Sequence, residues 1–277
     1  MRRALLLLVI VCGLGLGVAG CGALDDARDE ADRQIARVKD KAREVRADLR
    51  RLRDEVEREV NETLADIRGV LPRADADTRP PQRQSSTPIT VFLDDVLANV
   101  DEYWSTTLRA ADLPAPDVRA VWVEAGTVVQ SGCDAPADDQ AAFYCPADDT
   151  IYLGLGISRD ILAAMGDFGV AYVVAHEYSH NIQAELGWFE EGRRVTTVAP
   201  FELQADCMAG AWGYAVYEQG RLDDGDVEEA VRTAFAVGDF DTTNPQHHGT
   251  PDQRQDAWLS GYESGDPSSC RSFVLGT

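Results

Sequence analysis

The sequence predicts an α+β domain, a small sheet together with several helices, preceded by a long charged α-helical segment. Apolar residues recur at helical spacing on both sides of residues 118–153, and inside that region short β-branched segments alternate instead. The N-terminal quarter has a charged heptad pattern of its own. With 277 residues, 44% of them hydrophobic, the chain can bury the core of one or two domains.

The N-terminus has the pattern of an export signal. Two arginines precede an apolar run, Ala4–Ala19, which is shorter than the ~20 residues that span a bilayer. Small residues then lead to Cys21, which resembles the lipobox of bacterial lipoproteins. The resemblance implies that residues 1–20 are a signal peptide and that Cys21 carries a lipid anchor. The alternative is an uncleaved transmembrane anchor, and in both cases the remaining chain lies outside the cytoplasm.

Residues 21–71 are expected to form a helical stalk. This segment contains no proline, and its charges alternate in sign. Steps of three and four separate its apolar residues, which is typical of a coiled coil, although a single charged helix fits the pattern equally well. These residues are Ala31, Ile35, Val38, Ala42, Val45, Leu49, Leu52 and Val56. A stalk would hold the domain away from the membrane and could join copies into a homo-oligomer.

Residues 72–88 are rich in Pro, Ser and charge, so we expect an extended linker there and a globular domain over residues 89–277. In this domain, helical patterns lie before and after two β-branched patterns. The expected helices are 90–113, 158–166, 168–186, 201–210 and 253–261, and the expected strands are 118–129 and 150–153.

The charge of the chain excludes some partners. Its net charge is −22, and residues 72–277 hold 12 basic and 34 acidic side chains, with no lysine. Such a surface would repel phosphates, so we expect no binding of nucleic acid or anionic lipid through this domain. Solubility is the simpler reason for the excess of acid.

Four cysteines, Cys133, Cys145, Cys207 and Cys270, remain after the N-terminal segment. An even number in an exported domain predicts disulfides, and four cysteines allow three pairings. We favour Cys133–Cys145, which closes a short loop, and Cys207–Cys270, which ties a helix to the C-terminal tail. No pair has C-x-x-C spacing, so a structural zinc site is not expected.

The expected helix at 168–186 carries the sequence His-Glu-Tyr-Ser-His, with His176, Glu177 and His180. Residues four apart lie on one face of a helix, so both imidazoles can hold one ion and Glu177 can reach a water bound to it. This H-E-x-x-H arrangement is typical of zinc peptidases. The alternative is an ordinary polar face of an amphipathic helix.

A catalytic zinc site needs a third protein ligand. The next helical stretch offers Glu202 and Asp206, again four apart. We expect Glu202 to bind Zn2+ and Asp206 to accept a hydrogen bond that orients one of the imidazoles. Cys207 is an alternative soft ligand, although a disulfide suits the exported context better.

The other two histidines stand together in His247-His248-Gly249-Thr250-Pro251, shortly before Arg254. Peptide hydrolysis needs a donor for the oxyanion that develops on the scissile carbonyl, and either His248 or Arg254 could serve. The segment also predicts a helix start, with Thr250 as N-cap and Pro251 in the first helical position. The two interpretations are compatible.

Four motifs resemble those of the bacterial neutral zinc metallopeptidases, a gluzincin-type group: H-E-Y-S-H-N-I-Q, E-L-Q-A-D-C-M-A-G, F-Y-C-P-A-D-D-T-I-Y-L and H-G-T-P-D-Q-R. The resemblance covers residues 131–273. It implies a zincin-like fold, zinc ligands His176, His180 and Glu202, and Glu177 as catalytic acid and base. Ser179, Asn181 and the pair Pro251-Asp252 depart from the family's usual residues, and none of them is a ligand.

We therefore expect an exported, membrane-anchored zinc endopeptidase that acts on peptides or proteins. The strand at 150–153 is either an edge strand that pairs with an extended substrate or an internal strand of the core. Two other functions stay open. One is a non-catalytic envelope scaffold assembled through the stalk, and the other is a zinc amidase acting on cell-wall peptides.

Overall fold

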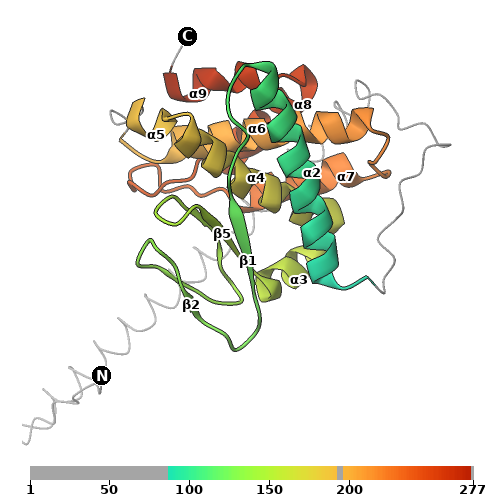
Figure 1. Ribbon diagram of the computed structural model, residues 1–277, viewed down its shortest axis with the longest axis vertical. Helices are drawn as coiled ribbons and strands as arrows, with labels where there is room; N and C mark the ends of the chain where they lie inside the picture. The colour runs from blue at the N-terminus through green and yellow to red at the C-terminus, as the bar shows by residue number, and fades with distance from the viewer. Residues whose placement is uncertain (1–86, 192–195, 276–277) are drawn as a thin grey trace, which may run out of the picture. The chain divides into compact units, whose positions relative to one another are not determined.

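The computed structural model describes residues 87–191 and 196–275. The predicted signal peptide and stalk lie outside these residues, as does the predicted linker up to residue 86. In the described part, the helices pack against one another and the strands lie together at one side of the helices (Figure 1). The α+β class predicted for the domain is confirmed.

Among the described residues the first helix is α2 (Ile89–Ala110), which matches the expected helix at 90–113 closely. The remaining elements follow in chain order. The strands are β1 (Arg119–Val123), β2 (Val129–Gln130), β3 (Pro136–Ala137), β4 (Ala142–Cys145) and β5 (Thr150–Gly154). The helices are α3 (Leu155–Ala164), α4 (Asp167–Glu185), α5 (Trp188–Glu191), α6 (Ala199–Glu218), α7 (Asp226–Ala236), α8 (Pro251–Ser264), the 3-10 helix η1 (Pro267–Arg271) and α9 (Ser272–Leu275).

Three of the strands form one sheet in the order β1-β5-β4. Strand β5 is parallel to β1 and antiparallel to β4, and every residue of β5 is buried. Of the two alternatives for the strand at 150–153, the internal strand of the core is confirmed and the edge strand is not, because both edges of β5 are paired. In this sheet β4 is an edge strand.

The prediction of one continuous strand over residues 118–129 is wrong, because this segment holds β1 and the start of a separate strand, β2. Strand β1 ends at Val123, and a turn follows in which the N–H of Thr127 donates to the carbonyl of Glu124 at 3.0 Å. Gly126 has φ +78 in this turn, a conformation that favours glycine. The chain then enters β2, which pairs with β3 in a separate ribbon.

Helix α4 is the central helix of the domain. It contacts α2, α3, α6, α7 and strand β4, and its residues from Phe168 to Ser179 are all buried. Its continuous apolar sequence before His176 follows from this position, because no face of the helix is left to water.

Helices α6 and α8 pack at backbone contact. A Cβ at Gly210 would lie 2.0 Å from the carbonyl oxygen of Trp258, and one at Gly261 would lie 1.8 Å from that of Cys207. The Cys207–Cys270 disulfide joins α6 to η1, and Cys133–Cys145 joins a loop to β4, so both predicted pairs are present. The rigid pairing of α6 with α8 fixes the side chains that they place in the interior.

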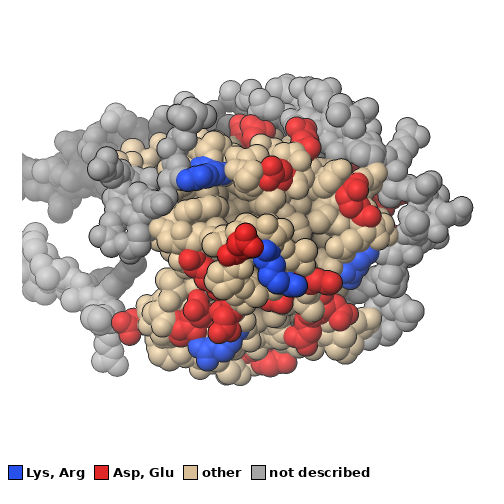
Figure 2. Space-filling view, turned by 45° about the horizontal axis from the view of Figure 1, so that its top comes forward, with Lys and Arg blue, Asp and Glu red and all other residues tan. Residues whose placement is uncertain are grey.

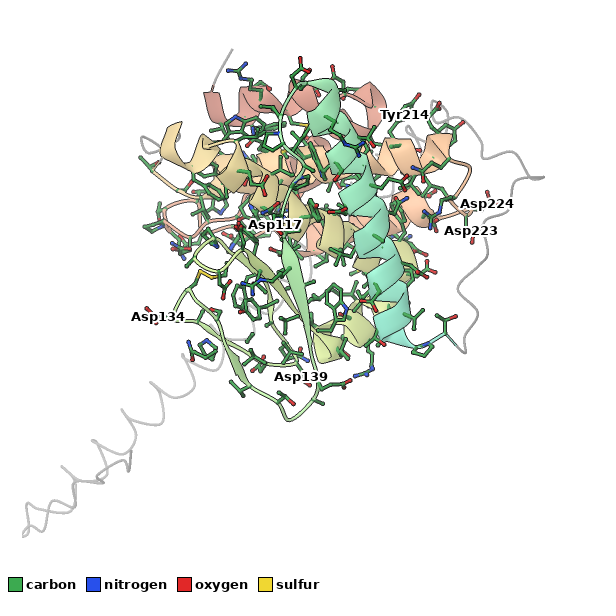
Figure 3. All side chains as sticks on the ribbon, viewed as in Figure 1. Asp117, Asp134, Asp139, Tyr214, Asp223 and Asp224 are labelled. Atoms are coloured by element: carbon green, nitrogen blue, oxygen red, sulfur yellow. A yellow bond between two sulfur atoms is a disulfide. The ribbon has the colours of Figure 1, made fainter. Side chains whose placement is uncertain are left out.

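Acidic side chains lie mostly at the surface. On the face shown in Figure 2 they are spread widely, with fewer basic side chains between them. Asp134, Asp139 and Asp224 lie at the rim of the molecule in Figure 3. Among the described residues, no helix has the length and apolar character needed to cross a membrane.

Candidate metal centre

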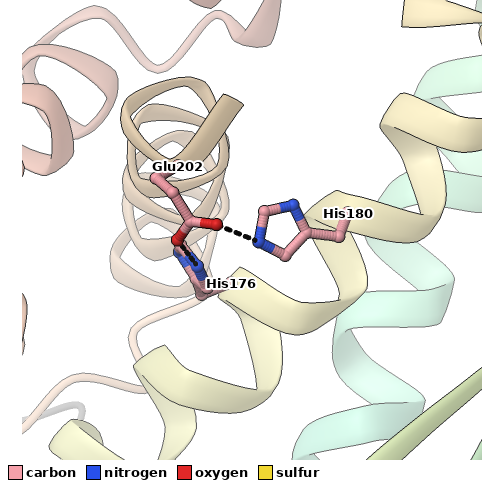
Figure 4. Close-up of side chains that lie close together, drawn as sticks. All are labelled: His176, His180 and Glu202. Carbon is pink, nitrogen blue, oxygen red and sulfur yellow. Dashed lines mark ion pairs between the residues drawn. The ribbon is translucent and has the colours of Figure 1, made fainter. Parts of the chain in front are cut away.

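Helices α4 and α6 bring together His176, His180 and Glu202 (Figure 4). The Nε2 atom of His176 lies 3.3 Å from Oε2 of Glu202, and Nε2 of His180 lies 3.4 Å from Oε1 of the same carboxylate. One donor atom from each residue fits within 4.8 Å of the others. The i,i+4 spacing on α4 and the crossing of α6 thus gather two imidazoles and one carboxylate around one point.

Asp206 orients His176. Its Oδ1 lies 2.8 Å from Nδ1 of His176, so the ring donates on that side and turns Nε2 towards Glu202. Burial disfavours the charged imidazolium, but Asp206 and Glu202 outweigh burial and raise the pKa of His176 to about 9. The surroundings of this imidazole therefore favour a cation, either a proton or a metal ion.

A neutral side chain orients His180. The Nδ1 atom of His180 lies 2.8 Å from Oε1 of Gln183, whose amide nitrogen donates to the carbonyl of Phe201 at 2.7 Å and to Gln204 at 3.0 Å. Gln183 is absent from the sequence prediction, although its place three residues after His180, on the same face of the helix, could have indicated it.

Glu177 lies beside this group and is buried. Its Oε2 accepts a hydrogen bond of 2.8 Å from the backbone N–H of Tyr144 on the edge strand β4. Tyr144 is a second residue that the sequence does not predict. The bond holds the carboxylate between the metal-binding group and the sheet.

Glu202 is ionised in its surroundings. Burial opposes its charge, but His180, His176 and Arg254 together hold the pKa of Glu202 well below its usual range. A carboxylate that stays charged while nearly buried is a suitable ligand for a divalent cation.

The two candidates for the oxyanion donor occupy different positions. Arg254 is buried, and its guanidinium donates to both carboxylate oxygens of Asp206 at 2.7 and 2.8 Å. The side chain of His248 is 47% exposed and lines the same cavity as Glu177. Arg254 also lines this cavity, but its side chain is only 4% exposed and is bonded to Asp206, so His248 is the more accessible of the two candidate donors.

The segment before α8 fixes His248. Its backbone N–H donates to Asp239 at 2.9 Å, and the other oxygen of Asp239 lies 2.6 Å from Nδ1 of His247. Asp239 is a third residue near the site that the sequence did not predict. Thr250 caps α8 in a capping box with Gln253, as predicted.

A cavity of about 820 Å3 surrounds these groups. Glu177, both α4 histidines, Glu202 and His248 line it. Most of its remaining wall is apolar and comes from β4, α3, α4, α5, the start of α6 and the end of α7. These apolar residues include Ala142, Phe143, Ile157, Ile161, Val173, Phe189, Phe201, Ala236 and Val237.

The family model described as "Putative neutral zinc metallopeptidase" matches residues 65–273. The chain belongs to this family. "Uncharacterized protein YpfJ" of Escherichia coli (strain K12) is 35% identical over 205 residues, which are 66% of this chain and 70% of the relative. "Uncharacterized protein Rv2575" of Mycobacterium tuberculosis (strain H37Rv) is 32% identical over 203 residues, 63% of this chain and 67% of the relative. No solved structure gives a significant match.

Membership of this zinc metallopeptidase family implies a metal cofactor, and His176, His180 and Glu202 form a group that could hold it. The donor set fits zinc, which accepts two imidazole nitrogens and a carboxylate and leaves a position for water. The hydrogen bonds on both Nδ1 atoms also suit this use, because they turn both Nε2 atoms towards Glu202.

Proposed function

We propose that the chain is a zinc-dependent peptidase that cleaves peptide bonds in the cavity beside His176, His180 and Glu202. The observation that carries this proposal is the position of Glu177, a buried carboxylate held next to that group by the N–H of Tyr144. When bound, zinc supplies a water of lowered pKa and polarises the scissile carbonyl.

Glu177 acts as general acid and base. The hydrogen bond from Tyr144 occupies Oε2, so the other carboxylate oxygen takes the proton of the attacking water and passes it to the leaving amine. The geometry supports this role because the bond fixes the carboxylate in one orientation inside the cavity wall.

His248 donates to the oxyanion. Its backbone is fixed through Asp239, and its imidazole lines the cavity. Arg254 is less suited to this role, because its Nε and Nη2 already donate to Asp206.

Strand β4 supports binding of an extended peptide. Alternate residues of an antiparallel strand direct their backbone groups to opposite sides. Ala141 pairs with β5 through Gly154, whereas Tyr144 donates to Glu177, so Ala142 and Tyr144 turn their backbone groups towards the cavity. The apolar walls favour substrates with bulky apolar side chains near the scissile bond.

Glu177→Gln tests the mechanism. The variant should bind zinc as wild type does and lose about 100- to 10,000-fold in peptide hydrolysis, measured with a peptide library and metal analysis. Glu185→Gln, an exposed carboxylate on the same helix, should keep activity. Undiminished cleavage by the Glu177 variant would contradict the mechanism.

The same assay separates the rival functions. Zinc binding without turnover of any peptide by wild type would favour the scaffold, and turnover of isolated cell wall without turnover of proteins would favour the amidase.

We also propose that the protein is exported and anchored by a lipid on Cys21, with the stalk as a candidate site of self-association. The two disulfides support an oxidising compartment. Cys21→Ser should move the protein from the membrane fraction to the soluble fraction. Retention of that variant in the membrane would favour an uncleaved anchor.

A further inference from the structure

Arg254 has more contacts with the metal-binding group than an oxyanion donor would need. Beyond its two bonds to Asp206, its Nη2 donates to the hydroxyl of Tyr172 at 3.2 Å. Its Nη1 lies 3.5 Å from Oε2 of Glu202, and its Nη2 lies 3.4 Å from both ring nitrogens of His176. The buried guanidinium therefore contacts both Glu202 and His176, which are candidate ligands. It also contacts Asp206, the carboxylate that orients His176.

We propose that Arg254 is a positioning residue of the metal centre, which holds Asp206 against His176 and holds Glu202 towards the metal. This inference rests on the proposed zinc site. It adds a residue on a third helix to a site otherwise built from α4 and α6.

The physical reason is the charge of Asp206. This carboxylate is fully buried, and a buried charge without a counter-charge is strongly destabilising. Arg254 supplies the counter-charge in a bidentate geometry, which fixes both the position and the plane of the carboxylate. Asp206 can then accept the Nδ1–H of His176 in a single orientation.

The fold makes this support rigid. Arg254 lies in the first turn of α8, directly after the Thr250–Gln253 capping box. The close contacts at Gly210 and Gly261 set the distance between α8 and α6. The guanidinium therefore reaches Asp206 from a helix that cannot shift without breaking backbone contacts.

The test is zinc affinity, measured by competition with a chromophoric chelator in Arg254→Gln and Arg254→Lys. Loss of a partner that orients a ligand costs about 10- to 100-fold in metal affinity, and we expect a loss in this range for Arg254→Gln. Arg254→Lys keeps the charge without the planar fork, so it should recover only part of the affinity. If Arg254→Gln does not fold, the zinc affinity of Arg254→Lys alone tests the inference.

Two further variants separate positioning from packing. Trp258→Phe, a buried change on the same helix, should lower the melting temperature of the metal-free protein and leave zinc affinity unchanged. Asp206→Asn combined with Arg254→Gln should lose less affinity than the sum of the single losses, because the two residues act as a pair.

The outcomes are distinct. Wild-type zinc affinity in every Arg254 variant that folds overturns the inference and leaves the proposed peptidase intact. Wild-type protein that binds no zinc overturns both.

Discussion

Two groups of side chains in the described part of the chain are spaced closely enough to hold a metal ion. One is His176, His180 and Glu202, and the other is Asp167, Asp226 and Glu229. The first combines nitrogen donors with a carboxylate and has Arg254 beside it. The second contains carboxylates only.

The second group has another use. Glu229 accepts a hydrogen bond of 2.9 Å from the N–H of Phe168 in the first turn of α4, and Asp226 accepts one of 2.7 Å from the N–H of Asp223 before α7. These bonds satisfy backbone donors where helices begin. Burial, with Asp167 and Glu229 nearby, raises the pKa of Asp226 to about 7. Closeness of acids is therefore a weaker sign of a metal site than oriented imidazoles with a counter-charge.

The largest expected effect is a loss of zinc affinity, which should follow a substitution in the first group and not one in the second. Glu202→Ala removes a proposed ligand, so affinity should fall by more than the roughly 100-fold that loss of an orienting partner can cost. Glu229→Gln should leave it unchanged. Chelator competition measures both, and equal losses would show that the acidic group also binds metal.

A smaller effect concerns the stability of the acidic group. The folded pKa of Asp226 is about 7, above the unfolded value of about 3.9, so its stabilising contribution is present in full below pH 4 and is lost as the pH rises through 7. Asp226→Asn stays neutral, and should be more stable than wild type by on the order of 3 kcal/mol at pH 8 but not at pH 4.

Urea unfolding at the two pH values measures this difference. Asp224→Asn, an exposed neighbour, serves as the control and should show no such pH dependence. An equal gain for Asp226→Asn at both pH values would mean that ionisation of Asp226 is not the cause.

The smallest effect tests the hydroxyl that supports Asp206. Tyr172→Phe removes one donor from a carboxylate that keeps Arg254 and His176, so the free energy of unfolding should fall by about 1 kcal/mol. Tyr178→Phe, on the same helix, loses a bond to Asp101 on α2, which is not a member of the metal-binding group. Zinc affinity should fall slightly in the first variant and stay unchanged in the second. A similar loss of zinc affinity in both variants would mean that the effect comes from a general change in α4 and not from the bond to Asp206.

Local spacing explains what could be predicted. The pairs His176/His180 and Glu202/Asp206 are each four residues apart, and helical geometry alone places each pair on one face. Helix α7 was not predicted, although its first turn holds Asp226, Glu228 and Glu229, which is typical of a helix start.

Long-range contacts explain most of what was missed. Tyr144 reaches Glu177 across 33 residues and Arg254 reaches Asp206 across 48, and no local pattern reports such pairs. The edge position of β4 is of the same kind, because it depends on which strands flank β5.

Local sequence was enough to predict the candidate ligand types, their helical spacing, the paired cysteines and the resemblance to the family. Packing was needed to show which strand faces the cavity, which carboxylate has Arg254 beside it, and that His248 is more exposed than Arg254. The physical reason is that ligand type and i,i+4 geometry are local properties. Strand pairing, burial and charge compensation arise only when distant segments pack together.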